Sequence, residues 1–383
     1  SQALDGFWWS PLPKHLLENV APGELARADF NRNPVGSGPF RFVSWRPNQE
    51  LLLAANDSFP AALGGRPNLD RVAFRIIPEP TTIVTELLSG TTDVIGYTLL
   101  PDQAQQIEQQ GGRRAELRHY PYREFTYIGW NTTRPQFSDP RVRRALALAL
   151  DRQGMIDALL HGYGQPASGM IPPWSPLAPD VPPMPFDPTT AKALLAEAGW
   201  TDRNGDGIVE NAQGQPLRFT LLTNTGNQLR QDIVTVAQQQ LRQVGVDVEV
   251  RTQEFQSMLA QHKARNYDAI LTSWILDTFK VDPTPLFTCE EARKPGSANR
   301  AGYCNPEADR LIEQGLRTTD AAAAKPIWAD FTRLLQQDQP ITFLFWLDDL
   351  AGVGPRLHDV VMDPRGKLVN VQEWWIPEGQ QRR

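Results

Sequence analysis

Two side chains in the second half of the chain could hold a positively charged group. Trp274 ends an apolar, partly β-branched run that is typical of a buried strand, and Asp277 follows three residues later in a polar loop. Because a rigid strand would present both side chains, the indole could form an apolar wall and the carboxylate could bind a cation, above all an ammonium group. The alternative is structural, with Trp274 in a hydrophobic core and Asp277 starting a turn or capping a helix.

A second group of acidic residues has the spacing of a calcium loop. Oxygen-bearing side chains occupy the first, third and fifth positions of the run DRNGDGIVE, before a glycine: Asp202, Asn204 and Asp206. Ile208 could add a carbonyl oxygen and Glu210 a further carboxylate, but Gln213 stands at the twelfth position, where an EF-hand has glutamate. The sequence leaves two interpretations open, a bound calcium ion or a polar turn between a helix and a strand.

The two cysteines of the chain, Cys289 and Cys304, enclose a loop rich in charged residues, glycine and proline. No histidine or further cysteine lies nearby to complete a zinc site, so a disulfide is the simplest pairing. Closing a loop of this size would contribute on the order of 3 kcal/mol to stability and implies an oxidising compartment outside the cytoplasm. The alternative is a pair of unpaired, buried thiols.

Composition narrows the possible classes of function. The 383 residues carry a formal net charge of −6 without a cluster of Lys and Arg, so nucleic acid is not an expected partner. No apolar run approaches the roughly 18 residues that span a bilayer, and any export signal would lie upstream of Ser1. The five histidines fall in unrelated contexts, as surface or helix-end residues, and no metalloprotease, nucleophile-elbow, Walker or dinucleotide motif occurs. We therefore expect no enzymatic activity, although a catalytic carboxylate pair, as in glycosidases, would leave no such motif.

The elements that would position these residues alternate between strands and helices. The expected strands are 217–223, 246–252 and 267–274, with helices between them, which predicts a parallel or mixed sheet covered by helices. Asp139 and Pro140 predict the start of a further helix with one apolar face. Because the chain is too long for one ordinary core, we expect two lobes, and the extended segment 116–131 could cross from one to the other.

Several of these segments resemble family 5 extracellular solute-binding proteins, the dipeptide and oligopeptide receptors of ABC importers. The resemblance rests on the runs PLPKH, NPVGSGPFRFVSW and FSDPRVRRALALALDRQGMIDALLHGYGQPA, and on the segment that contains Trp274, Asp277, Asp282, Pro283, Leu286, Phe287 and Cys289, with Cys304 at the position of the family's second cysteine. It extends from about Pro13 to Trp375. It implies a two-lobe α/β fold of the periplasmic-binding-protein type (type II, cluster C), with mixed sheets covered by helices and a two-strand hinge. The first lobe would comprise 1–121 and 347–383, and the second lobe 122–346.

The resemblance also implies a function. A monomeric receptor, periplasmic or lipid-anchored on the outer face of a bacterial cytoplasmic membrane, would close its lobes over a peptide and deliver it to an ABC permease. Asp277 would receive the N-terminal ammonium group of the peptide, and Trp274 would lie along the ligand. No cofactor is required, and calcium is the possible exception.

The sequence departs from this family pattern in two places. Dipeptide receptors hold the ligand carboxylate with an arginine before the helix that contains Ile233, and here the nearest arginine, Arg230, matches that position poorly. A longer peptide, a metal chelate or an oligosaccharide therefore remains an alternative ligand, and a hydrolase or regulatory protein on the same scaffold remains an alternative function. Members of this family begin well upstream of the position that matches Ser1, so we expect the chain to lack the N-terminal part of the first lobe and the small extra domain.

Overall fold

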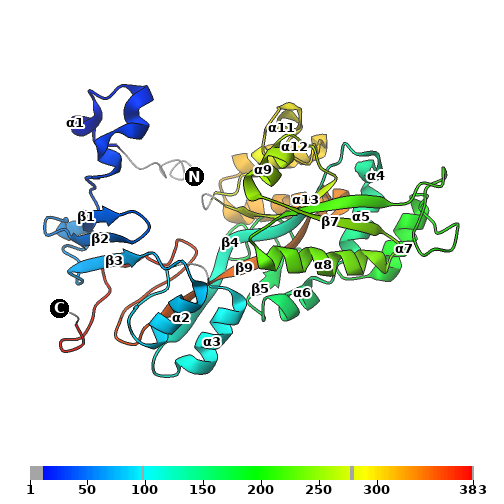
Figure 1. Ribbon diagram of the computed structural model, residues 1–383. Coiled ribbons are helices and arrows are strands. Elements are labelled where there is room, and N and C mark those ends of the chain that lie inside the picture. Colours follow the sequence, from blue (N-terminus) through cyan, green and yellow to red (C-terminus); the bar gives the residue numbers. More distant parts are fainter. Residues whose placement is uncertain (1–11, 97–98, 277–279, 382–383) are drawn as a thin grey trace. The chain divides into compact units, whose positions relative to one another are not determined.

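The structure, a computed structural model, describes residues 12–96, 99–276 and 280–381 (Figure 1). The described residues form two compact units. The larger unit is Arg123–Leu347, and the smaller unit comprises residues 12–122 and 348–381. No helix in these ranges is both long and apolar enough to cross a membrane.

A six-stranded mixed sheet forms the centre of the larger unit, in the order β5-β9-β4-β8-β6-β7. Its strands are β4 (Glu116–Trp130), β5 (Gly164–Pro166), β6 (Arg218–Asn224), β7 (Asp247–Gln253), β8 (Ala269–Ile275) and β9 (Ile341–Val353). β6 runs parallel to both β7 and β8, whereas β4 is antiparallel to β8 and β5 is antiparallel to β9. The first residues of β4 and the last residues of β9 belong to the smaller unit, so the chain passes between the units within these two strands.

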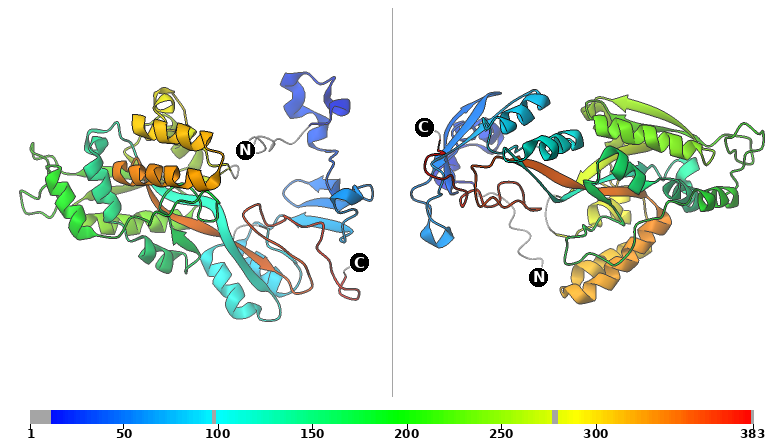
Figure 2. Two further views of the ribbon diagram at one scale, coloured as in Figure 1. Left: turned by 180° about the vertical axis from the view of Figure 1, so that it is seen from behind. Right: turned by 90° about the horizontal axis from the view of Figure 1, so that it is seen from below.

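Helices cover both faces of this sheet. They are α4 (Pro135–Ser138), α5 (Pro140–Leu148), α6 (Arg152–Leu159), α7 (Pro188–Glu197), α8 (Gln228–Arg242), α9 (Phe255–Lys263), α10 (Thr284–Phe287), α11 (Cys289–Arg293), α12 (Pro306–Arg317) and α13 (Ala321–Asp338). As expected from the sequence, α5 begins after Asp139, whose side chain accepts a hydrogen bond of 2.8 Å from the Arg141 backbone N–H. α8 and α13 lie on opposite sides of the sheet (Figures 1 and 2), so both faces of the sheet are buried.

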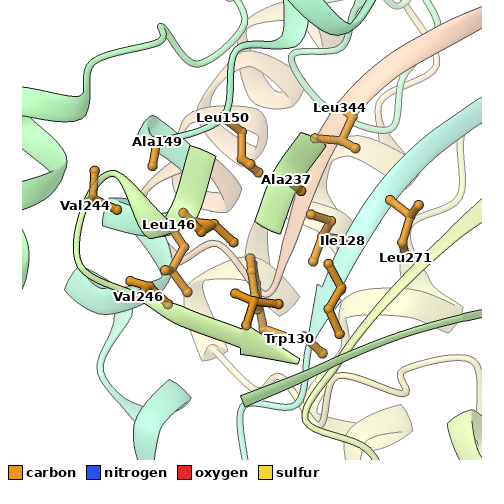
Figure 3. Packing of buried hydrophobic residues seen from close by; sticks show 14 of the residues in the cluster. Ile128, Trp130, Leu146, Ala149, Leu150, Ala237, Val244, Val246, Leu271 and Leu344 are labelled. Atoms are coloured by element: carbon orange, nitrogen blue, oxygen red, sulfur yellow. The ribbon is translucent and has the colours of Figure 1, made fainter. Parts of the chain in front are cut away.

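The alternation of side chains along β4 places its apolar residues in two different cores. Ile128 and Trp130 point toward α5 and α8, where they pack with residues such as Leu146 and Ala237 (Figure 3). Each fully buried aliphatic or aromatic side chain in such a core contributes roughly 1.5 to 3 kcal/mol. The intervening residues of β4 face the opposite core, which contains α12 and α13. This second face carries the site described below.

The smaller unit contains a three-stranded antiparallel sheet and short helices. Its elements are α1 (Lys14–Leu17), the 3₁₀ turns Pro22–Arg27, Asp29–Asn31 and Ala61–Leu63, the strands β1 (Phe40–Arg46), β2 (Glu50–Ala55) and β3 (Arg71–Arg75), and the helices α2 (Pro80–Leu88) and α3 (Pro101–Gly111). Val94 forms an isolated bridge with Val353 of β9. The C-terminal tail consists mainly of turns, and a bridge pairs His358 with Trp375.

Candidate functional site

The pairing of β4 with β8 brings aromatic side chains together on one face of the larger unit. Phe125 lies opposite Trp274, and Tyr127 lies opposite Thr272. Phe125, Tyr127 and Gly129 are two residues apart and therefore share this face. A Cβ atom at Gly129 would approach the Tyr127 ring to 3.3 Å, so the glycine leaves room for that ring. The result is an apolar surface with the phenol of Tyr127 at its centre.

A cavity of about 20 Å³ lies against this surface. Its lining combines aromatic, aliphatic and cationic side chains: Phe125, Tyr127, Gly129, His262, Tyr267, Trp274, Leu286, Phe287, Ala298, Arg300, Ala301 and Ile341. A cavity of this size has room for about one water molecule, so it is a small subsite and not a complete ligand cavity. Trp274, which the sequence singled out, is half-buried and lines it.

Arg300 and His262 form a polar pair at the wall of the cavity. The guanidinium Nη1 of Arg300 lies 3.0 Å from Nδ1 of His262. Burial, and secondly the charge of Arg300, lower the pKa of His262 to about 3, so the imidazole is neutral near pH 7. Because a guanidinium can only donate, Nδ1 of His262 must accept, which leaves the ring proton on Nε2. Tyr267 contacts both members of the pair. Its hydroxyl donates to the Arg300 carbonyl oxygen at 3.1 Å, and its ring packs against the His262 imidazole edge to face.

Two arginines lie beside this surface, and neither forms an ion pair with a residue that the structure describes. The Nε atom of Arg300 is buried without a hydrogen bond, and within the described ranges no carboxylate lies within ion-pair distance of Arg300 or Arg230. Arg230 donates from Nη1 to the side-chain oxygen of Asn224 at 2.8 Å. Burial raises the pKa of Tyr127 to about 12, and the charges of Arg300 and Arg230 oppose that rise, which places both guanidinium groups near the phenol. Burial lowers the pKa of Arg230, and the charge of Glu124 opposes this change, so Arg230 has an acid nearby although it forms no ion pair with it. Arg300 is the partly buried guanidinium best suited to binding a carboxylate.

A disulfide encloses the loop that carries Arg300. Cys289 and Cys304 are bonded, as the sequence predicted. Inside this loop the fully buried Asn299 donates to the carbonyl oxygens of Thr288 and Tyr303 at 3.0 and 2.7 Å. Arg265 donates to the Asn299 carbonyl oxygen at 2.7 Å. The loop is therefore held by a covalent bond and by buried hydrogen bonds, which fixes the backbone on both sides of Arg300.

Loss of the disulfide is expected to destabilise the larger unit. Because the cysteines are separated by 15 positions in the sequence, the double substitution Cys289→Ser and Cys304→Ser should lower the free energy of unfolding by about 3 kcal/mol. Urea denaturation with and without a thiol reductant would measure this change. The reductant should shift the midpoint of the parent chain and leave that of the double variant in place; an equal response of both proteins would contradict the expectation.

The structure places the other sequence-predicted residues as follows. Asp277 lies outside the described residues. Asp202, Asp206 and Glu210 lie close together between α7 and β6, and Asn204 lies beside Asp206, so these residues form a separate cluster. Sequence reasoning did not identify Tyr127, His262 or Arg300, because no motif marks them and they meet only through tertiary packing. His262 does lie at a helix end, as expected for the histidines, but it is buried.

The chain is similar to known proteins over most of its length. Residues 7–293 match the model of the bacterial extracellular solute-binding proteins, family 5 (middle part). The oligopeptide-binding protein AppA of Bacillus subtilis is 34% identical over 371 residues, which cover 95% of this chain and 66% of the relative, and the glutathione-binding protein GsiB of Pectobacterium atrosepticum is 29% identical, with 85% and 61% covered. The structure of Bacillus subtilis AppA in complex with a nonapeptide superposes with a TM-score of 0.76 at 32% identity, covering 96% of this chain and 72% of that one.

These similarities confirm the expected family and its mixed α/β fold. The chain spans just under two thirds of the length of the two curated relatives. The family model matches residues 7–293, which are most of the chain and include Trp274 and Arg230. The chain therefore belongs to the bacterial extracellular solute-binding proteins, family 5.

Proposed function

We propose that this chain is an extracytoplasmic receptor that binds a peptide and delivers it to an ABC permease. The proposal is carried by Arg300, a partly buried guanidinium that forms no ion pair within the described ranges, beside the aromatic surface of β4 and β8, with Arg230 near the same phenol. Membership of a family of solute-binding proteins supports it, as does similarity to relatives named for binding an oligopeptide and glutathione. The residues of the site can bind and orient a ligand.

Each side chain has a distinct role in this proposal. Trp274, which is half-buried, lies along the ligand as an apolar wall, and Tyr127, whose hydroxyl makes no hydrogen bond within the described ranges, lines the small cavity beside it. Arg300 and Arg230 bind a carboxylate of the peptide, either its C-terminus or an acidic side chain. Asp277 binds the N-terminal ammonium group. Because the peptide backbone would be recognised at its ends, the side chains between could vary.

The structure gives little support to the hydrolase alternative. Nδ1 of His262 is already engaged by Arg300, and a pKa of about 3 makes the imidazole a poor base near neutral pH. Binding without turnover is therefore the expected behaviour. We place the protein on the outer side of the cytoplasmic membrane, either free in the periplasm or held by a lipid, and we propose that it acts as a monomer; light scattering of the purified chain tests the last point.

Replacing Arg300 is expected to weaken the binding of peptides that carry a free carboxylate. A hydrogen bond between charged groups is worth roughly 1.5 to 3 kcal/mol, so Arg300→Met should lower the affinity about 10- to 150-fold. Isothermal titration calorimetry with a nonapeptide library that has free C-termini and contains no acidic residues would measure the loss. The same library with amidated C-termini should bind the parent chain and Arg300→Met equally.

Two controls make this test specific. Arg242→Met removes an exposed arginine of the same unit and should leave the affinity unchanged. Asp277→Asn should weaken both libraries, because both retain the N-terminal ammonium group. If Arg300→Met reduced the affinity for both libraries alike, Arg300 would not bind the C-terminus. Release of new amines during the titration would contradict the receptor function.

A further inference from the structure

The loop that follows α7 in the chain (α7 is labelled in Figure 1) leads to β6. Backbone hydrogen bonds close this loop and attach it to the larger unit. Thr201 and Glu210 exchange two backbone hydrogen bonds, of 3.0 and 2.9 Å. The Val209 N–H donates to the carbonyl oxygen of Gly245 at 2.8 Å, just after α8. Gly245 has a φ of +85°, and a Cβ atom there would lie 2.8 Å from a methyl carbon of Val209, so only glycine permits this approach. These contacts fix the backbone of Glu210 inside the unit.

Glu210 is buried with an incomplete set of partners. Glu210 as a whole is only 4% exposed. One carboxylate oxygen, Oε2, accepts a hydrogen bond of 2.8 Å from the Arg203 N–H, whereas Oε1 is buried and has no partner. A buried, ionised carboxylate is strongly disfavoured unless a cation or hydrogen-bond donors compensate its charge. We therefore expect a cation or a hydrogen-bond donor to bind at Oε1 of Glu210.

Two further acids lie beside the Glu210 carboxylate. Ligand atoms of Asp202, Asp206 and Glu210 all lie within 4.8 Å of one another. In the described part of the chain, no Lys or Arg forms an ion pair with any of the three. The two aspartates accept hydrogen bonds from backbone N–H groups of the loop, and each carboxylate keeps lone pairs beyond those bonds. Three negative charges thus converge on one point without a counter-charge.

We propose that this cluster is a calcium site in which Glu210 supplies the ligand from the buried side. Calcium binds oxygen atoms at about 2.3 to 2.6 Å, so two ligand oxygens on opposite sides of the ion are at most roughly 4.6 to 5.2 Å apart, which accommodates the observed separation. Asn204, whose amide donates to Asp206 at 3.2 Å, lies at the edge of the same cluster. Glu210, at the ninth position of the loop, takes the place of the acid that an EF-hand has at its twelfth position.

Magnesium fits this cluster less well than calcium. Magnesium requires octahedral geometry at about 2.0 to 2.1 Å and usually retains several water molecules. It therefore gains less from a buried carboxylate that approaches directly from the protein side. The ion would join the segment after α7 to the start of β6 and would stabilise the larger unit, independently of whether a peptide is bound.

The test uses the full chain after treatment with a chelator. Titration with calcium chloride should give saturable heat, and calcium at about 100 times its dissociation constant should raise the melting temperature by about 5 °C. Glu210→Gln should abolish both effects. Without calcium, Glu210→Gln should melt no lower than the parent chain, because it removes a buried charge that has no counter-charge, and the glutamine amide oxygen can still accept from the Arg203 N–H. If Glu210 had only a structural role, Glu210→Gln would instead lower the melting temperature by the same amount with and without calcium.

Two more variants and a second metal complete the test. Asp206→Asn, at an exposed position, should weaken calcium binding at least tenfold and is not expected to impair folding. Asp180→Asn, an exposed acid of the same unit outside the cluster, should retain the full calcium response. The proposal is overturned if the parent chain shows neither heat nor a thermal shift at millimolar calcium, or if Glu210→Gln keeps the shift. An equal shift with magnesium chloride at the same concentration would overturn the assignment to calcium.

Discussion

Replacing Asp349 with alanine is expected to lower the free energy of unfolding by about 3 to 5 kcal/mol, because it leaves a buried ammonium group without its counter-charge. In the smaller unit, Nζ of Lys367 lies 2.7 Å from Oδ1 of Asp349, and both residues are less than a tenth exposed. The Tyr120 hydroxyl donates to the other carboxylate oxygen at 2.6 Å. Burial lowers the pKa of Lys367, and the Asp349 charge opposes this change. Removal of the carboxylate thus disrupts two interactions together.

A double variant separates two contributions to the free energy of unfolding: the net contribution of the ion pair, and the penalty for leaving one buried charge unpaired. Asp349→Leu with Lys367→Met removes both charges, so it should recover most of the stability that Asp349→Ala loses. Chemical denaturation can be followed by the fluorescence of Trp374, which is buried in the same unit. If Asp349→Ala cost no more than Asp180→Ala at the surface, Lys367 would not depend on this carboxylate.

The stability of the protein is expected to fall in mild acid because of His262. Its pKa in the folded chain is about 3, far below the ordinary value of 6.5, and burial is the main cause. Below pH 6.5 the unfolded chain binds a proton at this residue, whereas the folded chain does not. The contribution of His262 is therefore fully present above pH 6.5 and is lost by up to about 1.4 kcal/mol for each pH unit as the pH falls toward 3.

Denaturation at several pH values isolates this contribution. The free energy of unfolding should be measured between pH 7.5 and 4.5 for the parent chain, for His262→Gln and for His15→Gln. Glutamine at position 262 can still accept from Arg300 but does not titrate, so this variant should show a flatter pH dependence. His15 is exposed, and its replacement should keep the parent slope. Parallel curves for the parent chain and His262→Gln would show that the imidazole is not kept neutral by the fold.

Much of the local structure follows from the sequence because it depends on neighbouring residues. The cap at Asp139 and the alternation of apolar residues near β6, β7 and β8 correctly predicted those elements. Their pairing with β4, and the two cores on either side, required the tertiary arrangement.

The parts of the site that could be predicted are likewise those that depend on local sequence. Trp274 was identified because it ends a clear strand pattern, and the disulfide because the chain has only two cysteines. Arg300 resembles any other charged residue of a polar loop until the fold places it against His262. The burial of Glu210 could not be predicted either, because it depends on tertiary contacts of the loop: Glu210 pairs with Thr201, and its neighbour Val209 pairs with Gly245.

The disulfide has a thermodynamic consequence that extends to the ligand. Cys289 and Cys304 enclose the residue that we propose binds the peptide carboxylate, so reducing the bond would allow Arg300 to sample more conformations. Linkage is reciprocal: if oxidation raises the affinity for the peptide by some factor, a bound peptide disfavours reduction of the disulfide by that same factor. A loaded receptor would therefore resist thiol reductants better than an empty one, and its redox state and its occupancy would report on each other.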